Sequence, residues 1–107
     1  MTPEQLVARK KKLASAARAL ITGELGLVRA SNHIRRALES LGSEKPDSFV
    51  VFDQFYKAIP LDIPLGVARL QWPIDLLLKH DSRLEKIEAE YKPALLRAAA
   101  ELVKRYG

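Results

Sequence analysis

The sequence predicts an all-α protein, a single-domain bundle of five or six helices over residues 1–107. Three observations carry this prediction. The length of 107 residues fits one domain. A content of 48% hydrophobic and 29% charged residues is typical of a folded chain. Apolar residues recur at spacings of three and four along most of the chain, which is the pattern of helices that bury one face.

The first two helices are predicted at 3–22 and 24–41. Thr2 and Gln5 are spaced as a capping box around Pro3, and proline suits the first helical position. Gly23 and Gly26 then weaken the helix, and the apolar periodicity resumes after them. Two paths remain open at Gly23. A kink would keep the two helices roughly collinear, whereas a tight turn would make a hairpin.

A loop is expected at 42–48, where glycine, proline and small polar residues gather. The next segment opens like a strand. However, one face at helical spacing is formed by Phe49, Phe52, Phe55 or Tyr56, and Ile59, and a lone strand would have no partner. The sequence therefore predicts a third helix over about 49–59.

An apolar, proline-rich connection comes next, at 60–66. Pro60 and Pro64 exclude a regular helix there. Because its side chains are apolar, we expect this connection to pack onto the core. A short helix is expected at 67–72.

Two further helices complete the prediction. Pro73 can start a helix over about 73–80, whose inward-facing residues are expected to be Ile74, Leu77 and Leu78. The spacing of Ser82 and Glu85 indicates a new capping box and a last helix that runs to Tyr106. Pro93 interrupts this last helix and predicts a kink near Ala89.

No catalytic or metal-binding set is recognisable. The chain has no cysteine, which excludes disulfides, thiolate metal sites and a cysteine nucleophile. His33 and His80 lie far apart, without the carboxylate spacing of a zinc motif, so both are interpreted as structural. We therefore expect no enzyme activity, no catalytic residue, no metal and no cofactor. Neither a targeting peptide nor a membrane helix is expected, and the predicted location is cytoplasmic.

Positive charge is concentrated in the first half of the chain. The formal net charge is +5; residues 1–48 hold nine Lys/Arg against five Asp/Glu, a net of +4. Such a surface attracts an acidic protein or a nucleic acid. A net charge of this size also keeps a small domain from aggregating, without any partner. The candidate binding residues are Arg9, Lys10, Lys11, Lys12, Arg35 and Arg36, the last two joining the others if the first two helices are antiparallel.

The segment 63–72 is the least ordinary part of the chain. Gly66, Arg69 and Trp72 are spaced at three and stack on one side of a helical turn. Arg69 is expected to pair with Asp62 or Asp75, or to stack on Trp72. One interpretation is architectural, with Trp72 in the core. The other is a partner-facing anchor, since Trp and Arg dominate the energetics of many interfaces. A small-molecule pocket beside Arg69 is a third alternative.

Pro64, Gly66, Arg69 and Trp72 form a Pro-x-Gly-x-x-Arg-x-x-Trp pattern. With residues 20–25 and the closing helix, this pattern resembles a family of small, uncharacterised bacterial helical proteins. The chain departs from that family just before the motif, where it has fewer acidic residues. The resemblance implies no known activity. The family is similar, in its small size and bacterial setting, to immunity proteins, which neutralise toxins. We therefore expect a protein-binding module, with a toxin of acidic surface as the candidate partner and nucleic acid as the alternative. The oligomeric state is left open.

Overall fold

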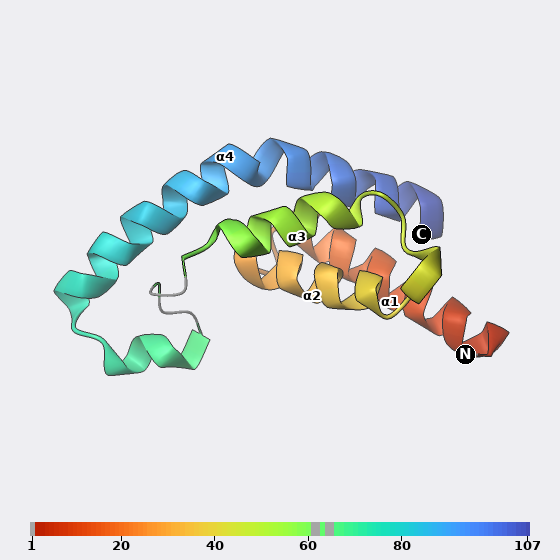
Figure 1. Cartoon of the computed structure of the whole chain (residues 1–107), viewed down its shortest axis with the longest axis horizontal. Helices are drawn as coiled ribbons and strands as arrows, with labels where there is room; N and C mark the ends of the chain where they lie inside the picture. The colour runs from red at the N-terminus through yellow and green to blue at the C-terminus, as the bar shows by residue number, and fades with distance from the viewer. Residues whose placement is uncertain (1, 61–62, 64–65) are drawn as a thin grey trace.

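The computed structural model describes residues 2–60, 63 and 66–107. These residues form an all-α fold without strands, which confirms the predicted class (Figure 1). The predicted number of five or six helices is wrong, because the described residues form four α-helices and two short 3-10 helices. In chain order the elements are α1 (Pro3–Thr22), α2 (Leu27–Glu39), η1 (Gly42–Glu44), α3 (Phe49–Ala58), η2 (Gly66–Gln71) and α4 (Ile74–Tyr106).

Helix α1 begins with the predicted capping box. The Gln5 backbone N–H donates to the Thr2 hydroxyl at 3.2 Å, and the Thr2 backbone N–H donates to the Gln5 side-chain oxygen at 3.0 Å. Two of the free backbone donors at the helix start are thereby satisfied. The helix ends where Gly23 adopts the left-handed conformation, with φ 77°, which costs glycine little because it has no Cβ.

Helices α1 and α2 form an antiparallel hairpin, which decides between the two paths left open at Gly23. The left-handed Gly23 reverses the chain, and α2 starts four residues later. Near the other end of the hairpin, the Arg9 guanidinium donates to the Ser40 carbonyl oxygen at 2.7 Å. Ser40 is the C-cap of α2, so this bond joins the start of α1 to the end of α2.

One apolar cluster draws side chains from all four α-helices. Phe52 and Phe55 of α3 are almost completely buried in it, as the phenylalanine spacing of the sequence predicts. They pack with Leu13 of α1, Ile34 of α2 and Leu95 of α4, all with no exposed surface. Burial of large apolar side chains contributes about 1.5–3 kcal/mol each, so this cluster is the main source of stability.

Helix α4 is a single helix of 33 residues, so the predicted boundary at Ser82 is wrong. No glycine or proline lies between Ile74 and Ser82, and nothing there ends the helix. Pro73, rather than opening the helix from its first turn, is the N-cap. Pro93 lies inside α4, and both it and Ala89 are exposed to solvent. Water can therefore bind the carbonyl that loses its intrahelical donor. Figure 1 shows α4 arching over the other helices.

The first turns of α4 extend beyond α1, α2 and α3 at one end of the molecule, and η2 lies beside them (Figure 1). We call the described residues 66–80 the arm. The chain termini lie at the opposite end. Of the proline-rich connection before the arm, Ile63 is buried, with 4% of its surface exposed, in agreement with the expected packing on the core. Pro64 lies outside the described residues.

Candidate functional site: the arm and the basic side chains

The arm carries a concentration of exposed apolar side chains. Among the described residues, nine large apolar side chains are exposed, and five of these fall within residues 70–78. Leu70 is 87% exposed, Ile74 73% and Leu78 64%. The prediction that Ile74 and Leu78 face inward is therefore wrong. Single exposed apolar residues are ordinary, but several of them on one short segment, with Ile74 and Leu78 on one helix face, are typical of a contact surface.

An ion pair holds η2 against α4. The two terminal nitrogens of Arg69 donate to the two carboxylate oxygens of Asp81, at 2.5 and 2.9 Å. This two-point contact lowers the pKa of Asp81 below its ordinary value and raises the pKa of Arg69, chiefly through the hydrogen bonds themselves. Asp81 is the partner, and not Asp75; Asp62, the other expected partner, lies outside the described residues. Sequence reasoning missed it because Asp81 was placed beyond the end of a separate helix.

Trp72 lies at the edge of the arm and not in the core. The residue is 37% exposed, and its ring meets His80 edge to face, with 5.1 Å between the ring centroids. The architectural interpretation is thus wrong for Trp72. The architectural interpretation does fit Arg69, because its guanidinium pairs with Asp81 and so connects η2 to α4.

Two of the basic candidates serve the fold. Arg9 binds the C-terminal end of α2 through the Ser40 carbonyl. Arg35 lies 3.9 Å above the Tyr56 ring of α3 and is mostly buried, with 14% of its side chain exposed. Its guanidinium also donates to the side-chain oxygen of Asn32, at 3.1 Å, and to a carboxylate oxygen of Glu39, at 3.2 Å. Arg35 is therefore engaged with α3 and does not extend the basic run of α1.

The remaining basic candidates are closer to solvent. Lys10, Lys11 and Arg105 line an open pocket of about 460 Å³ between the start of α1 and the end of α4. The Lys10 amine lies 5.7 Å from the centre of the Tyr106 ring in the same pocket. Lys12 and Arg36 are exposed on the surfaces of their helices. This basic end of the molecule is opposite the arm (Figure 1).

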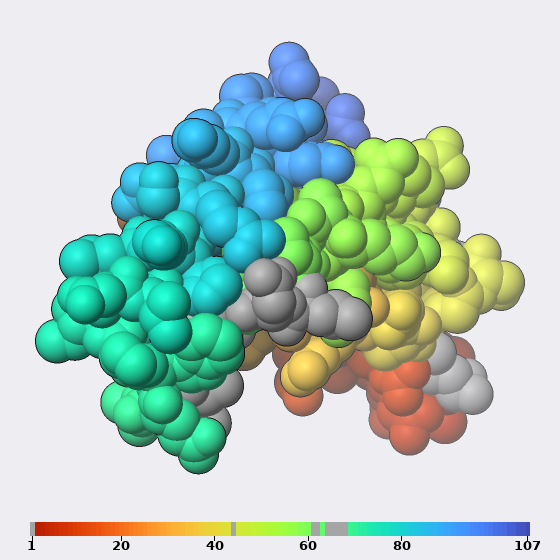
Figure 2. Space-filling model, turned by 60° about the vertical axis from the view of Figure 1, so that its left-hand side comes forward, coloured from red at the N-terminus to blue at the C-terminus, as the bar shows by residue number. Residues whose placement is uncertain are grey.

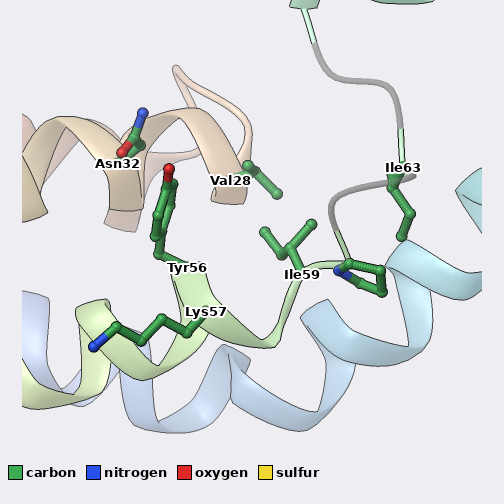
Figure 3. A pocket seen from close by; sticks show the side chains of 7 residues that line it. Val28, Asn32, Tyr56, Lys57, Ile59 and Ile63 are labelled. Carbon is green, nitrogen blue, oxygen red and sulfur yellow. The ribbon is translucent and has the colours of Figure 1, made fainter.

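A second pocket, of about 400 Å³, was not predicted from the sequence. It lies between α2 and the end of α3, and its lining is mostly apolar. Figure 3 shows Tyr56 of α3, and Ile59 directly after that helix, facing Val28 and Asn32 of α2; Ile63 also lines the pocket. Arg69 is not among its lining residues, so this pocket is not the cavity considered beside that arginine. The signal that could reveal it is the apolar run Ile59-Pro60, which comes directly after the end of a helix.

Within the part of the chain that the structure describes, no group of three or more His, Asp or Glu side chains is placed to hold a metal ion. Nor is any helix there both long and apolar enough to cross a bilayer.

Comparisons with known proteins find no family model that matches the chain, and no curated protein or solved structure that is similar to it. The resemblance of the Pro64–Trp72 motif to a bacterial family stays a prediction.

Proposed function

We propose that this chain is a protein-binding module whose arm docks against a partner protein. The observation that carries the proposal is the group of exposed apolar side chains on η2 and the first turns of α4, led by Leu70, Ile74 and Leu78. Removing such side chains from water favours association by about 25 cal/mol per Å² of apolar surface. Because these three side chains are exposed and outside the core, they can gain this burial energy only by contact with a partner.

The way the arm is held supports the same function. The Arg69–Asp81 contact fixes η2 on α4 before any partner binds. A surface that is already ordered loses less conformational entropy on binding, which leaves more of the burial energy for affinity. Trp72, partly exposed beside His80, supplies the kind of aromatic side chain that is enriched at the energetic centre of interfaces.

We further propose that the partner is a toxin and that the module acts as an immunity-type inhibitor, which occludes part of the toxin surface. The resemblance of the Pro64–Trp72 motif supports this class. The charge of the chain supports an acidic partner, because the formal net charge is +5. Lys11 and Arg105, which line the pocket between the start of α1 and the end of α4, add to a positive field outside the arm. Charges outside the contact accelerate encounter more than they add to affinity.

The test is capture of partners from native cell lysate with three tagged proteins: wild type, Ile74→Ser and Val50→Ser. Val50 is the matched control, since it is 54% exposed on α3 and outside the arm. The proposal expects one stoichiometric protein with wild type and with the Val50 variant, and its loss with the Ile74 variant. A partner that is retained equally by all three proteins contradicts the arm as the docking surface.

Nucleic-acid binding is the second candidate. The observation in its favour is the open pocket that places Lys11 beside Arg105. Against it, Arg9 and Arg35 are used inside the fold. Fluorescence anisotropy with a labelled duplex at low salt tests it. Binding that falls steeply with added salt, and that Lys11→Ala weakens, would favour this candidate. The third alternative, a small molecule bound by Arg69, is disfavoured because Asp81 already occupies both terminal nitrogens.

A further inference from the structure

We propose that, when no toxin occupies it, the arm binds a second copy of this chain, in a two-fold contact between the first turns of two α4 helices running antiparallel. This inference rests on the proposed function and adds a second occupant of the same surface. It is drawn from the order of four residues, Ile74, Asp75, Leu78 and Lys79, on the exposed side of the arm.

These residues form two adjacent rows along α4. Ile74 and Leu78 are four positions apart, so they lie one above the other on one face of the helix, and both are strongly exposed. Asp75 and Lys79 are also four apart and come one position later, which places them along one flank of the apolar row. Both of these charged residues are exposed as well.

A two-fold axis across the apolar row makes this surface complementary to itself. With the helices antiparallel, Ile74 of each copy meets Leu78 of the other. Flanking positions on the same side of two antiparallel helices face each other. Asp75 of each copy therefore faces Lys79 of the other, and the contact contains two pairs of opposite charge.

The charges also select the direction of pairing. In a parallel arrangement of the same two faces, the flank that carries Asp75 and Lys79 would lie against the opposite flank of the partner helix, so neither of these opposite-charge pairs could form. Opposite charges that meet across an interface favour the arrangement that pairs them. The position of Asp75 and Lys79 on one flank thus favours the antiparallel dimer.

The shape of the molecule leaves room for this contact. The arm projects beyond α1, α2 and α3 in Figure 1 and forms a separate lobe in Figure 2. Two arms can overlap while the rest of each molecule points away. Because the contact involves only two helical turns and η2, its area lies at the low end of specific interfaces, below about 1,200 Å². We therefore expect a weak dimer, with a Kd on the order of 10–100 µM.

Sedimentation equilibrium of the full chain provides the first test, over about 5 µM to 1 mM to bracket that Kd. Wild type should pass from monomer to dimer over this range. Ile74→Ser should raise the Kd at least about tenfold, and Val50→Ser should leave it unchanged. Circular dichroism of each variant verifies that the helices are intact. A wild-type chain that stays monomeric throughout overturns the inference.

A charge exchange tests the antiparallel register. Asp75→Lys gives two lysines on the flank, and Lys79→Asp gives two aspartates, so each variant alone places like charges in contact and should dimerise more weakly than wild type. Mixed together, the two variants restore both opposite-charge pairs and should form a heterodimer about as stable as the wild-type dimer. A mixture that dimerises no better than either variant alone overturns this register.

The outcomes separate this inference from the function on which it rests. If wild type is monomeric but still captures another protein in a manner that Ile74→Ser abolishes, the second copy is the wrong occupant and the arm remains a docking surface. If wild type is monomeric and the arm variants capture partners normally, both proposals fail.

Discussion

Replacing Gly23 with alanine should lower the free energy of unfolding by about 1 kcal/mol. Gly23 has φ 77° and ψ 13° at the end of α1, and no atom lies within 4 Å of the position that a Cβ would take. The cost is therefore the left-handed backbone alone. That conformation costs a residue with a Cβ about 1–2 kcal/mol, and the stiffer unfolded chain offsets about 0.5 kcal/mol of it.

The sign of this change distinguishes the hairpin from a continuous helix. If Gly23 lay inside one kinked helix over residues 3–41, alanine would stabilise the protein by about 0.8–1 kcal/mol, because glycine is the poorer helix former. The two arrangements therefore predict results that differ by about 2 kcal/mol, which is well beyond the error of a denaturation experiment.

Gly26→Ala is the matched control for this experiment. Gly26 has φ −59° and ψ 154°, and here too no atom lies within 4 Å of the position that a Cβ would take. At an N-cap position alanine is less favourable than glycine, which lowers the stability of the folded state. Alanine also stiffens the unfolded chain, which raises the stability. The two effects offset each other, so the free energy of unfolding should change by no more than about 0.5 kcal/mol. Urea denaturation followed by circular dichroism measures both variants. An increase in stability for Gly23→Ala, or equal losses at the two glycines, would refute the hairpin argument.

Three further predictions concern the core and the ionisable side chains. Phe52→Ala, at a site with no exposed surface, should cost about 3–5 kcal/mol in urea denaturation; a cost below about 1 kcal/mol would contradict its place in the core. Glu88→Gln should slightly raise the thermal midpoint at neutral pH, since burial first and then Glu85 raise the pKa of Glu88 and disfavour its charged form. This gain should vanish as the pH falls below the ordinary value of 4.5, and a midpoint difference that is independent of pH would contradict it. The pKa of Asp81 is lowered, so its contact should contribute fully above pH 3.8 and be lost as the pH falls further. Fluorescence of Trp72, the one tryptophan of the chain, should report that loss, and Asp81→Asn should remove the acid transition.

The first helix could be predicted to the residue because its boundaries are encoded locally. Thr2, Pro3 and Gln5 specify the start, and Gly23 specifies the end. The path of the chain after Gly23 could not be predicted, since a left-handed glycine and a kinked helix are both compatible with the same local sequence. The hairpin depends on contacts between distant residues, such as Arg9 with the Ser40 carbonyl.

The candidate site could be predicted only in part. The sequence singled out Arg69 and Trp72, but it placed the apolar residues after them in the core. The reason is the boundary assumed at Ser82. In one continuous helix, the core-facing positions Tyr91 and Leu84 extend back in steps of seven to Leu77, and this row leaves Ile74 and Leu78 on another face. That pattern was present in the sequence, whereas the pairing of Arg69 with Asp81 required the tertiary structure.

The basic residues show why a run of charge in the sequence is a weak guide to a surface. Arg9 and Arg35 have long side chains that reach the Ser40 carbonyl and the Tyr56 ring, respectively. Consecutive residues of a helix point in different directions, so Arg9 to Lys12 cannot form one flat patch. Which of them remain exposed is decided by the neighbouring helices, and so lay beyond the sequence.

The central claim, that the arm docks a protein, is tested most directly by photo-crosslinking at its most exposed residue. Because the chain has no cysteine, Leu70→Cys can carry a single benzophenone label, and Val50→Cys provides an equally labelled control outside the arm. In native lysate, the label at position 70 is predicted to form one discrete protein adduct, whose mass shows whether the partner is a second copy, and the label at position 50 should not. Equal adducts at both positions, or none at position 70, would contradict the claim.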